Sequence, residues 1–335
     1  MIHAYVAREA RGKLERFEFE PGPLGPDQVE IDVAYCGICH SDLSMLNNEW
    51  QMTTYPFVPG HEATGRVAAV GANVKHLRVG QPVGLGWFAG SCMTCSQCLS
   101  GDHNLCASGE GTIVGRYGAF ANKVRCQAVW AIPVPEGLDL SKAGPLFCGG
   151  ITVFNPIVQF GVAPTDRVGV IGIGGLGHMA IQFLNKWGCE VVAFTSSKAK
   201  KDEARRMGAH KTVDSRDDAE LSKLAGSLDF LLCTANVPLN WDAYLATLRP
   251  KGRMHVVGAV PEPIPVSVFS LLIGQKSISS SPVGGPDVTA RMLEFCVRHG
   301  IAPIVEEFPM SKVNEAMAHL ASGKARYRIV LKNDF

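Results

Sequence analysis

The sequence of 335 residues lacks a charge excess and lacks any long apolar run. Lysines and arginines number 32 and acidic residues 31, so the net charge of +1 argues against a nucleic-acid or anionic-membrane partner. No apolar stretch reaches the about 18 residues that could cross a bilayer. The N-terminus, MIHAYVAREARGK, has neither the apolar core nor the cleavage site of a signal peptide. We therefore expect a cytoplasmic globular protein of about two domains.

Cysteine, by contrast, is plentiful, with eleven residues. In a reducing compartment a cluster of thiols indicates a metal site more than disulfides. Four thiols fall within one short segment, and four thiolates provide the closed tetrahedral coordination of a structural zinc: Cys92, Cys95, Cys98 and Cys106. An iron–sulfur cluster has a shorter last gap followed by proline, whereas Ala107 follows here. A zinc ribbon that grips nucleic acid would need cations, and residues 90–108 contain no lysine or arginine.

A glycine-rich turn lies near the middle of the chain, in RVGVIGIGGLGHMAIQF from Arg167 to Phe183. An apolar run meets Gly172, Gly174 and Gly177, and apolar residues then return at helical spacing. This strand–turn–helix pattern is the dinucleotide-binding fingerprint, in which backbone N–H groups and the helix N-terminus face a pyrophosphate. The pattern predicts a nicotinamide cofactor on a Rossmann-type domain.

The end of the next predicted strand indicates which cofactor. An NAD site places an acidic residue there to hold the ribose hydroxyls. Here the strand ends in Thr195, Ser196 and Ser197, then lysines 198, 200 and 201, and no carboxylate occurs before Asp202. Hydroxyls and lysines can bind a 2′-phosphate, so we predict NADP(H). The alternative is a solvated helix start with a serine cap, although lysines there oppose the helix dipole.

The periodicity changes along the chain. Up to about residue 132 it shows short alternating strands, typical of an antiparallel, barrel-like β domain; among these we predict strands over Ala119–Cys126 and Ala128–Ile132. From Arg167 strands alternate with helices, which predicts a doubly wound sheet of six parallel strands. From Pro286 onward the pattern no longer extends the sheet, so we expect the chain to return to the first domain and form a cleft between the domains. The six strands are predicted at Arg167–Ile171, Glu190–Thr195, His210–Val213, Leu228–Cys233, Arg253–Val257 and Ile278–Ser281, and the intervening helices at Leu176–Trp187, Lys198–Met207, Ala219–Ala225 and Trp241–Leu248.

Three further cysteines have weaker individual signals. Cys36 and Cys39 form a CxxC pair, which could be half of a zinc site, a redox pair or two buried thiols. The pair is followed by His40-Ser41-Asp42 and, further on, by Pro59-Gly60-His61-Glu62. Cys148 stands alone in the apolar segment GPLFCGGITVF, where a lone thiol is more often part of the core than a ligand.

Together, Cys39-His-Ser-Asp42, Gly60-His61-Glu62, the four-cysteine loop, Cys148 and the glycine-rich turn resemble the zinc-dependent medium-chain alcohol dehydrogenases. The segment around Cys148, the Thr-Ser-Ser-Lys turn and the ending Arg326-Tyr-Arg-Ile-Val resemble the cinnamyl alcohol dehydrogenase branch, whose members are broad NADP-dependent aldehyde reductases. The resemblance spans essentially the whole chain. It implies a GroES-like β-barrel catalytic domain over residues 1–150, an NADP-binding Rossmann domain over 151–284 and a return to the catalytic domain over 285–335. It also implies a homodimer.

The resemblance assigns roles to particular residues. Cys39, His61 and Cys148 would hold a catalytic zinc with its fourth position open to water or substrate, and the four-cysteine loop a structural zinc, with Cys36 a bystander. Ser41 would pass the alcohol proton, Asp42 would fix the tautomer of His61, and Glu62 would either replace water on the metal or be structural. His40 and Arg326 would touch the pyrophosphate. The remaining cofactor contacts would come from Thr152, Gly172, Gly174, Gly175, Leu176, Gly177, Thr195, Ser196, Ser197, Lys200 and Val257.

The chain departs from the family at Ser44, where related sequences often carry a histidine, so His40 or the cofactor ribose would have to complete the proton path. Trp50, Met52, Trp87 and Phe88 are candidates for an apolar pocket that accepts aromatic or medium-chain aldehydes, although residues of these types are more often part of the core. The prediction is an NADP- and zinc-dependent alcohol dehydrogenase that acts mainly as an aldehyde reductase. Two alternatives are an inactive NADP-sensing zinc protein and a polyol dehydrogenase, which commonly has a carboxylate where this chain has Cys148. A zinc-free quinone reductase fits poorly with Cys39 and His61.

Overall fold

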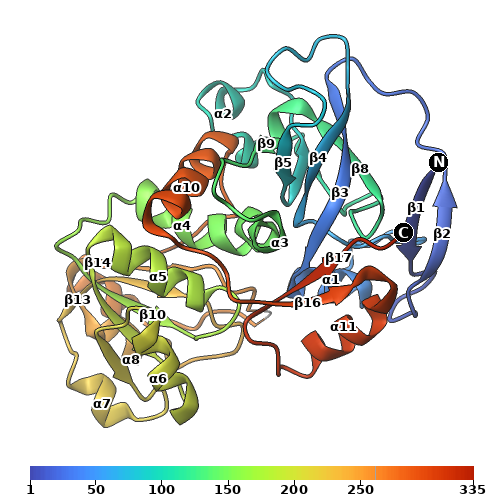
Figure 1. Ribbon diagram of the computed structural model, residues 1–335. Coiled ribbons are helices and arrows are strands. Elements are labelled where there is room, and N and C mark those ends of the chain that lie inside the picture. The colour runs from blue at the N-terminus through green and yellow to red at the C-terminus, as the bar shows by residue number, and fades with distance from the viewer. Residues whose placement is uncertain (261) are drawn as a thin grey trace. The chain divides into compact units, whose positions relative to one another are not determined.

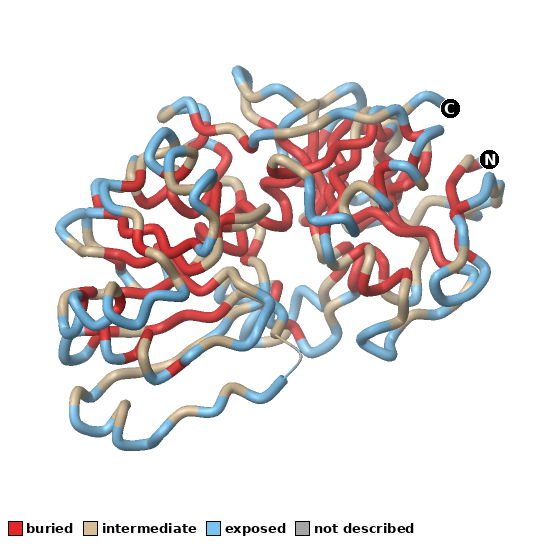
Figure 2. The backbone as a smooth tube through the Cα atoms, turned by 90° about the horizontal axis from the view of Figure 1, so that it is seen from below, coloured by how far each residue is buried: buried red, intermediate tan, exposed pale blue. Residues whose placement is uncertain are grey.

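A computed structural model of the protein describes residues 1–260 and 262–335. The chain divides into two compact units. Unit 1 comprises Met1–Ile151 and Val283–Phe335, and unit 2 comprises Thr152–Pro282. Each unit contains buried residues in its interior segments and exposed residues along others, as Figure 2 shows by colour.

Unit 1 is built on a largely antiparallel sheet of seven strands in the order β16-β17-β3-β4-β5-β9, with β8 also paired to β3. Its longest strand, β3, has eleven residues and pairs with β4, β8 and β17. Val29, Ile31 and Val33 alternate along β3 and are buried, which explains why this stretch forms the centre of the barrel-like core. The strands are β1 (Ile2–Val6), β2 (Glu15–Phe19), β3 (Gln28–Ile38), β4 (Ala63–Val70), β5 (Pro82–Leu85), β6 (Phe88–Gly90), β7 (Glu110–Gly111), β8 (Lys123–Gln127), β9 (Ile132–Pro133), β16 (Val305–Pro309) and β17 (Arg328–Lys332).

The two ends of the chain both lie in unit 1 (Figure 1). The ring of Phe335 contacts that of Tyr5 at 5.2 Å between centroids, and β17 lies antiparallel beside β3. The C-terminal segment therefore supplies a central strand of the first unit. The helices of this unit are α1 (His40–Leu46), α2 (Ser96–Leu99), α3 (Leu140–Ala143), α10 (Pro286–His299) and α11 (Val313–Ala321), and α4 (Gly149–Gln159) runs from it into unit 2.

Unit 2 is a parallel sheet of six strands in the order β12-β11-β10-β13-β14-β15. The prediction of a doubly wound, six-stranded sheet is confirmed. Figure 1 shows α5, α6 and α8 packed beside this sheet. The strands are β10 (Arg167–Ile171), β11 (Glu190–Phe194), β12 (Lys211–Val213), β13 (Leu228–Cys233), β14 (Leu248–Val256) and β15 (Ser277–Ser280); the helices are α5 (Gly177–Trp187), α6 (Lys198–Arg206), α7 (Asp218–Ser222), α8 (Trp241–Thr247) and α9 (Val268–Leu272).

Several predicted elements of unit 1 are wrong in detail. The predicted strand Ala128–Ile132 is a 3-10 turn over Ala128–Trp130 followed by the two-residue β9. The turn is fixed by Trp130, whose indole N–H donates to Ser91 Oγ at 3.3 Å and whose ring packs on Phe88. The predicted strand Ala119–Cys126 is regular only from Lys123 to Gln127, because Ala119 N–H donates to Gly60 O at 2.8 Å in a loop contact.

In unit 2 the predicted strands and helices are present, several of them with shifted boundaries, and one helix that was not predicted, α9, lies between β14 and β15. Helix α7 begins at Asp218 because the Asp217 carboxylate caps it, accepting from the N–H groups of Ala219 and Glu220 at 2.9 and 3.1 Å. Strand β14 begins at Leu248, where the predicted helix was expected to end, because Leu248 pairs with Leu228 before the chain kinks. Among the described residues, no helix is both long and apolar enough to pass through a bilayer.

Candidate active site

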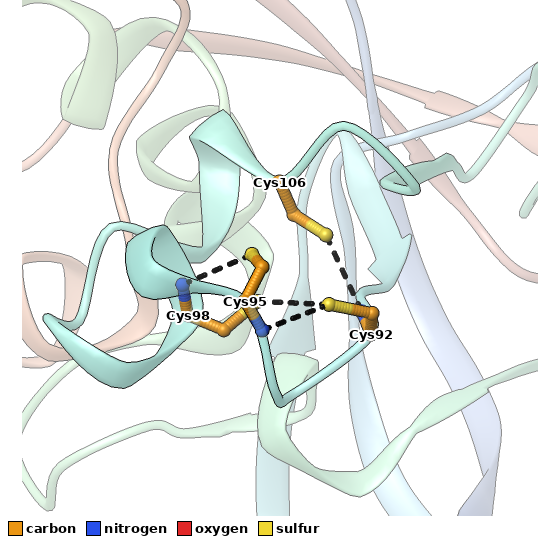
Figure 3. Close-up of side chains that lie close together, drawn as sticks. All are labelled: Cys92, Cys95, Cys98 and Cys106. Atoms are coloured by element: carbon orange, nitrogen blue, oxygen red, sulfur yellow. Dashed lines mark hydrogen bonds between the residues drawn. The ribbon is translucent and has the colours of Figure 1, made fainter.

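Among the described residues, two separate clusters of metal-binding side chains lie in unit 1, one partly exposed and one fully buried. The partly exposed cluster is the four-cysteine loop, whose sulfur atoms lie within 4.8 Å of one another (Figure 3). Four sulfur atoms around a zinc ion at about 2.3 Å would be about 3.8 Å apart, and the Sγ atoms of Cys92 and Cys98 are 3.9 Å apart. The cluster therefore fits a structural zinc.

The backbone of the loop turns its N–H groups toward the sulfurs. Cys95 N–H donates to Cys92 Sγ at 3.3 Å, Cys98 N–H to Cys95 Sγ at 3.5 Å, and Cys92 N–H to Cys106 Sγ at 3.4 Å (Figure 3). Hydrogen bonds from the backbone N–H groups of Thr94 and Cys95 lower the pKa of Cys92 to about 6. These bonds favour the thiolate form of Cys92, which is the form that binds a metal.

The buried cluster comprises Cys39, His61, Glu62 and Cys148, whose ligand atoms lie within 4.8 Å of one another. Cys39 Sγ lies 3.8 Å from Cys148 Sγ, and His61 Nε2 lies 3.3 Å from Cys148 Sγ. Two sulfurs and one ring nitrogen thus converge on one point, at spacings that a tetrahedral zinc requires. Cys39 precedes α1 and Cys148 precedes α4, so residues 109 positions apart meet at two helix starts.

The Asp42 carboxylate accepts three hydrogen bonds that connect the segments of this cluster. Its Oδ1 accepts from His61 Nδ1 at 3.0 Å and from Gly60 N–H at 2.8 Å, and its Oδ2 accepts from Cys39 N–H at 2.9 Å. Since a carboxylate accepts, Nδ1 of His61 carries a proton, and Nε2, which lies beside Cys148 Sγ, is the nitrogen that a metal would bind once Nε2 is deprotonated. Both side chains are fully buried.

Metal binding at this cluster would be coupled to the release of protons from its side chains. Burial disfavours a charged His61, yet the Asp42 carboxylate raises the pKa of the ring well above its ordinary value. The hydrogen bond from Cys148 lowers the pKa of Cys39 well below that of a free thiol. A metal ion bound here would displace protons, so binding weakens as the pH falls. The donor set of two thiolates and one imidazole fits a catalytic zinc with three protein ligands.

Glu62 has a partner that the sequence analysis missed. Its Oε1 is bonded to a guanidinium nitrogen of Arg328, and both side chains are buried. Arg328 belongs to β17, 266 residues away, and the pairing of β17 with β3 brings it to the ligand loop. No local motif marks such a residue, because only the strand order places it there.

The other predicted site residues of unit 1 differ in whether they lie at the buried metal cluster. Ser41 Oγ lies 3.6 Å from Cys39 Sγ, at the metal cluster. His40 begins α1 and is exposed, outside that cluster. Arg326 donates its backbone N–H to Glu306 Oε1 at 2.6 Å, and its guanidinium lies 5.8 Å from the ring centre of Tyr327.

In unit 2 the glycine-rich turn has the geometry of a phosphate cradle. Gly172 has φ of +85°, which favours glycine, and a Cβ at Gly177 would lie 2.0 Å from Gly172 O. A Cβ at Gly174 would meet no atom of the described residues within 4 Å, so these residues leave that face of the turn open. The turn leads directly into α5 at Gly177, as a dinucleotide site requires.

The segment predicted to recognise a 2′-phosphate follows β11. Lys200 Nζ donates to Ile173 O at 2.8 Å, which brings this cation onto the glycine-rich turn. Thr195 is buried and its Oγ1 accepts from Ser197 N–H at 3.3 Å, whereas Ser196 is exposed. Of the remaining predicted contacts, Thr152 is buried in α4, and Gly175, Leu176 and Val257 are partly exposed.

Comparisons with known proteins agree with this architecture. Residues 25–136 match the family model of the alcohol dehydrogenase GroES-like domain, and residues 175–298 match that of the zinc-binding dehydrogenases. An aldehyde reductase AdhA of Synechocystis sp. is 56% identical over 333 residues, covering 99% of each chain.

Two solved structures share the fold over nearly their full lengths. A cinnamyl alcohol dehydrogenase of Sorghum bicolor has a TM-score of 0.95 and 36% identity, covering 99% of this chain and 97% of the other. A cinnamyl alcohol dehydrogenase of Helicobacter pylori, solved with NADP(H), has a TM-score of 0.91 and 30% identity over the same shares. The two zinc-type clusters, the glycine-rich turn and these matches show that the chain belongs to the zinc-dependent medium-chain alcohol dehydrogenase family, in its cinnamyl alcohol dehydrogenase-like branch.

Proposed function

We propose that the protein is an NADPH-dependent aldehyde reductase, which converts aromatic or medium-chain aldehydes to primary alcohols at a zinc ion held by Cys39, His61 and Cys148. The observation that carries the proposal is the buried convergence of two thiols and one imidazole, with Asp42 fixing the imidazole tautomer. Three protein ligands leave a fourth position for the substrate oxygen. The relative from Synechocystis sp., named an aldehyde reductase, supports the direction of the reaction.

The preference for NADPH rests on the segment after β11. This segment offers hydroxyls and lysines and no carboxylate, and Lys200 reaches the glycine-rich turn. A carboxylate at that point would repel the 2′-phosphate of NADP, whereas a lysine attracts it. The Helicobacter pylori neighbour, solved with NADP(H), supports the same choice. Cofactor contacts from the predicted residues, including His40, Thr152, Val257 and Arg326, are part of the proposal.

The preference for apolar aldehydes rests on two tryptophans. The ring of Trp87 meets that of His61 edge-on at 5.0 Å, and Trp50 meets Trp87 edge-on at 6.1 Å. Trp50 and Met52 are exposed at 37% and 43%, so apolar surface reaches from the solvent toward the cluster. Phe88 is left out, because its ring packs on Trp130. Aromatic walls of this kind favour a planar, apolar substrate.

When bound, zinc polarises the aldehyde oxygen, and NADPH provides the hydride for the carbonyl carbon while one proton reaches the oxygen. The chain's own residues handle that proton. Ser41 Oγ, beside Cys39, can donate to the substrate oxygen and accept a replacement proton. Ser44 does not extend this path, because it donates to Glu49 Oε2 at 2.7 Å, so the exposed His40 is proposed as the outer group.

We also propose a cytoplasmic homodimer. All eleven cysteines are free thiols, which suits a reducing compartment. Beside β15, the last strand of its sheet, α9 and the next residue expose four apolar side chains at 64–82%: Val268, Phe269, Leu272 and Ile273. An unpaired strand edge next to an apolar patch suits pairing with a second copy. Ile273→Glu should convert dimers to monomers in light-scattering chromatography, whereas Val237→Glu, at another exposed apolar site, should not.

The activity is tested with purified protein, NADPH, and a panel of benzaldehyde-like, cinnamaldehyde-like and aliphatic aldehydes. We expect equimolar loss of NADPH and formation of the primary alcohol, together with two zinc ions per chain. Protein that holds both zinc ions and binds NADPH but reduces no aldehyde of the panel would refute the proposal and favour a cofactor-sensing protein.

The cofactor preference has its own test. Lys200→Ala should weaken NADPH binding about tenfold, through loss of one charge-assisted hydrogen bond, and leave NADH binding within about twofold. Lys223→Ala, an exposed lysine at the end of α7, is the matched control and should change neither. Equal losses for NADPH and NADH would mean that Lys200 supports the turn and does not select the cofactor.

A further inference from the structure

The buried metal cluster contains one potential ligand too many for a working enzyme. Besides Cys39, His61 and Cys148, the carboxylate of Glu62 offers an oxygen within 4.8 Å of the other ligand atoms. Two thiolates, one imidazole and one carboxylate would complete a tetrahedral zinc site. Such a site would be closed and would leave no position for a substrate. Something in the fold must therefore determine whether Glu62 binds the metal.

The two oxygens of Glu62 have different surroundings. Oε1 accepts from the guanidinium of Arg328. Oε2 is buried and has no hydrogen-bond partner among the residues that the structure describes. It lies against the backbone of Gly37, where a Cβ would be 2.0 Å away. The carboxylate is thus held by a cation on one oxygen only. Its second oxygen is uncommitted and is seated in a space that any side chain at position 37 would fill.

Charge explains why Arg328 is needed. A zinc ion with two thiolates and a neutral imidazole has no net charge, so Glu62 would be an unpaired buried anion without Arg328. Glu62 is 0% exposed and Arg328 5% exposed. Among the described residues, the cation that forms an ion pair with Glu62 is the guanidinium of Arg328. If that cation were removed, the remaining positive centre within reach of the carboxylate would be the metal.

The fold holds Arg328 firmly in this position. Its strand, β17, lies between β16 and β3, with Arg328 opposite Val305 in β16 and Ile329 opposite Ile38 in β3. Ile38 directly precedes Cys39, so β3 carries the ligand loop alongside the strand that carries the guanidinium. Because two strand pairings fix the backbone at Arg328, this residue cannot easily move with Glu62 toward the metal.

The geometry points to Arg328 as a positioning residue that keeps the catalytic metal site open, by holding Glu62 as its counter-ion and preventing it from becoming a fourth protein ligand. This inference rests on the proposed function, because it takes Cys39, His61 and Cys148 as ligands of the reactive zinc. In this role Arg328 would act through Glu62 and would not itself be a metal ligand.

The test measures the binding of a small ligand to the metal and does not depend on turnover. Cobalt is exchanged into the buried site, with zinc retained in the four-thiol loop, and imidazole is titrated as a small ligand for the open position while the visible cobalt bands are recorded. The wild type should bind imidazole with a clear change of its bands. Arg328→Met should bind it at least about tenfold more weakly, because the Glu62 carboxylate occupies the position. X-ray absorption of the zinc form should show one carboxylate oxygen in place of water.

Two further variants separate this role from a merely structural one. Arg328→Met/Glu62→Gln should regain imidazole binding to within about threefold of the wild type, because a neutral amide is a poor zinc ligand. Arg328→Lys, which retains the charge, should resemble the wild type. A purely structural arginine would give no rescue in the double variant.

The proposal is overturned if Arg328→Met binds imidazole like the wild type, or if the double variant stays as weak as the single one. Should Arg328→Met fail to fold, the wild type alone decides: a cobalt enzyme that takes up no imidazole, with a carboxylate among its ligands, would show that Glu62 already closes the site. Neither readout depends on aldehyde reduction, so failure of the proposed function remains a separate result.

Discussion

The two metal clusters of unit 1 are built in opposite ways. The four-cysteine loop takes its ligands from one segment of fifteen residues and surrounds them with backbone N–H groups. The buried cluster collects ligands that lie up to 109 residues apart and surrounds them with charged side chains, Asp42 and Arg328 among them. Local ligands with backbone support suit a site that cross-links the chain. Distant ligands with charged support suit a site whose reactivity must be adjusted.

The comparison is tested most severely by removing one ligand from the buried cluster. Cys148→Ser should lower the zinc content from two to one per chain and reduce turnover by about 1,000-fold or more, since a lost Lewis acid costs several kcal/mol. Cys36→Ser is the matched control: Cys36 is as deeply buried but lies outside the cluster, so both zinc ions and most of the activity should remain. Equal losses in the two variants, measured by metal analysis and kinetics, would contradict the ligand assignment.

The corresponding change in the exposed loop should affect stability first. Cys98→Ser should release the structural zinc and lower the free energy of unfolding by about 2–5 kcal/mol, similar to the loss of a native cross-link. Because the buried cluster is untouched, turnover at low temperature should stay within a few-fold of the wild type. Urea unfolding and thermal inactivation measure the effect, with Ser96→Ala in the same short helix as control. A loss of turnover without a loss of stability would reverse the roles assigned to the two clusters.

A smaller effect is expected from the charged support. Asp42→Asn keeps the shape and one acceptor oxygen but removes the negative charge beside His61. Zinc affinity of the buried cluster should fall about 10- to 100-fold, as is usual when the partner of a metal-bound histidine is changed. Competition with a chelator, while the four-cysteine loop retains its zinc, measures this directly. An unchanged affinity would mean that the burial of His61 alone fixes its orientation.

The smallest effect is expected from a side-chain hydroxyl in the four-cysteine loop, because backbone N–H groups provide most of the support there. Thr94 Oγ1 lies 3.7 Å from Cys92 Sγ, in addition to the N–H groups that surround the loop. Thr94→Val removes that hydroxyl and should cost at most about 1 kcal/mol of stability, because the backbone bonds remain. A thermal unfolding curve close to that of the wild type is the expected result. A loss as large as that of Cys98→Ser would show that side chains, too, support the exposed loop.

Local sequence patterns were sufficient for much of the molecule. The glycine-rich turn, the six parallel strands and the four-cysteine loop each depend on residues close together in the chain, and the structure confirms the sheet that they predicted. The failures occurred where a distant contact decides the local backbone. The segment Ala128–Trp130 turns because Trp130 contacts Ser91 and Phe88. Helix α1 was not predicted, because its start depends on the Asp42 carboxylate, which accepts from Cys39 N–H. That carboxylate is held in place by Gly60 and His61, which lie further along the chain.

The sequence alone determined the four-cysteine cluster and the cofactor fold, because short motifs fix a ligand set or a turn through bonds within a few residues. The family, and with it the ligands of the buried cluster up to 109 residues apart, followed from the occurrence of several such motifs together in one chain. Only the tertiary structure decided that Glu62 faces Arg328 and that Trp87 meets His61. These pairs join strands and loops that the sheet register brings together, and a buried charge finds its partner only when the whole core has closed around it.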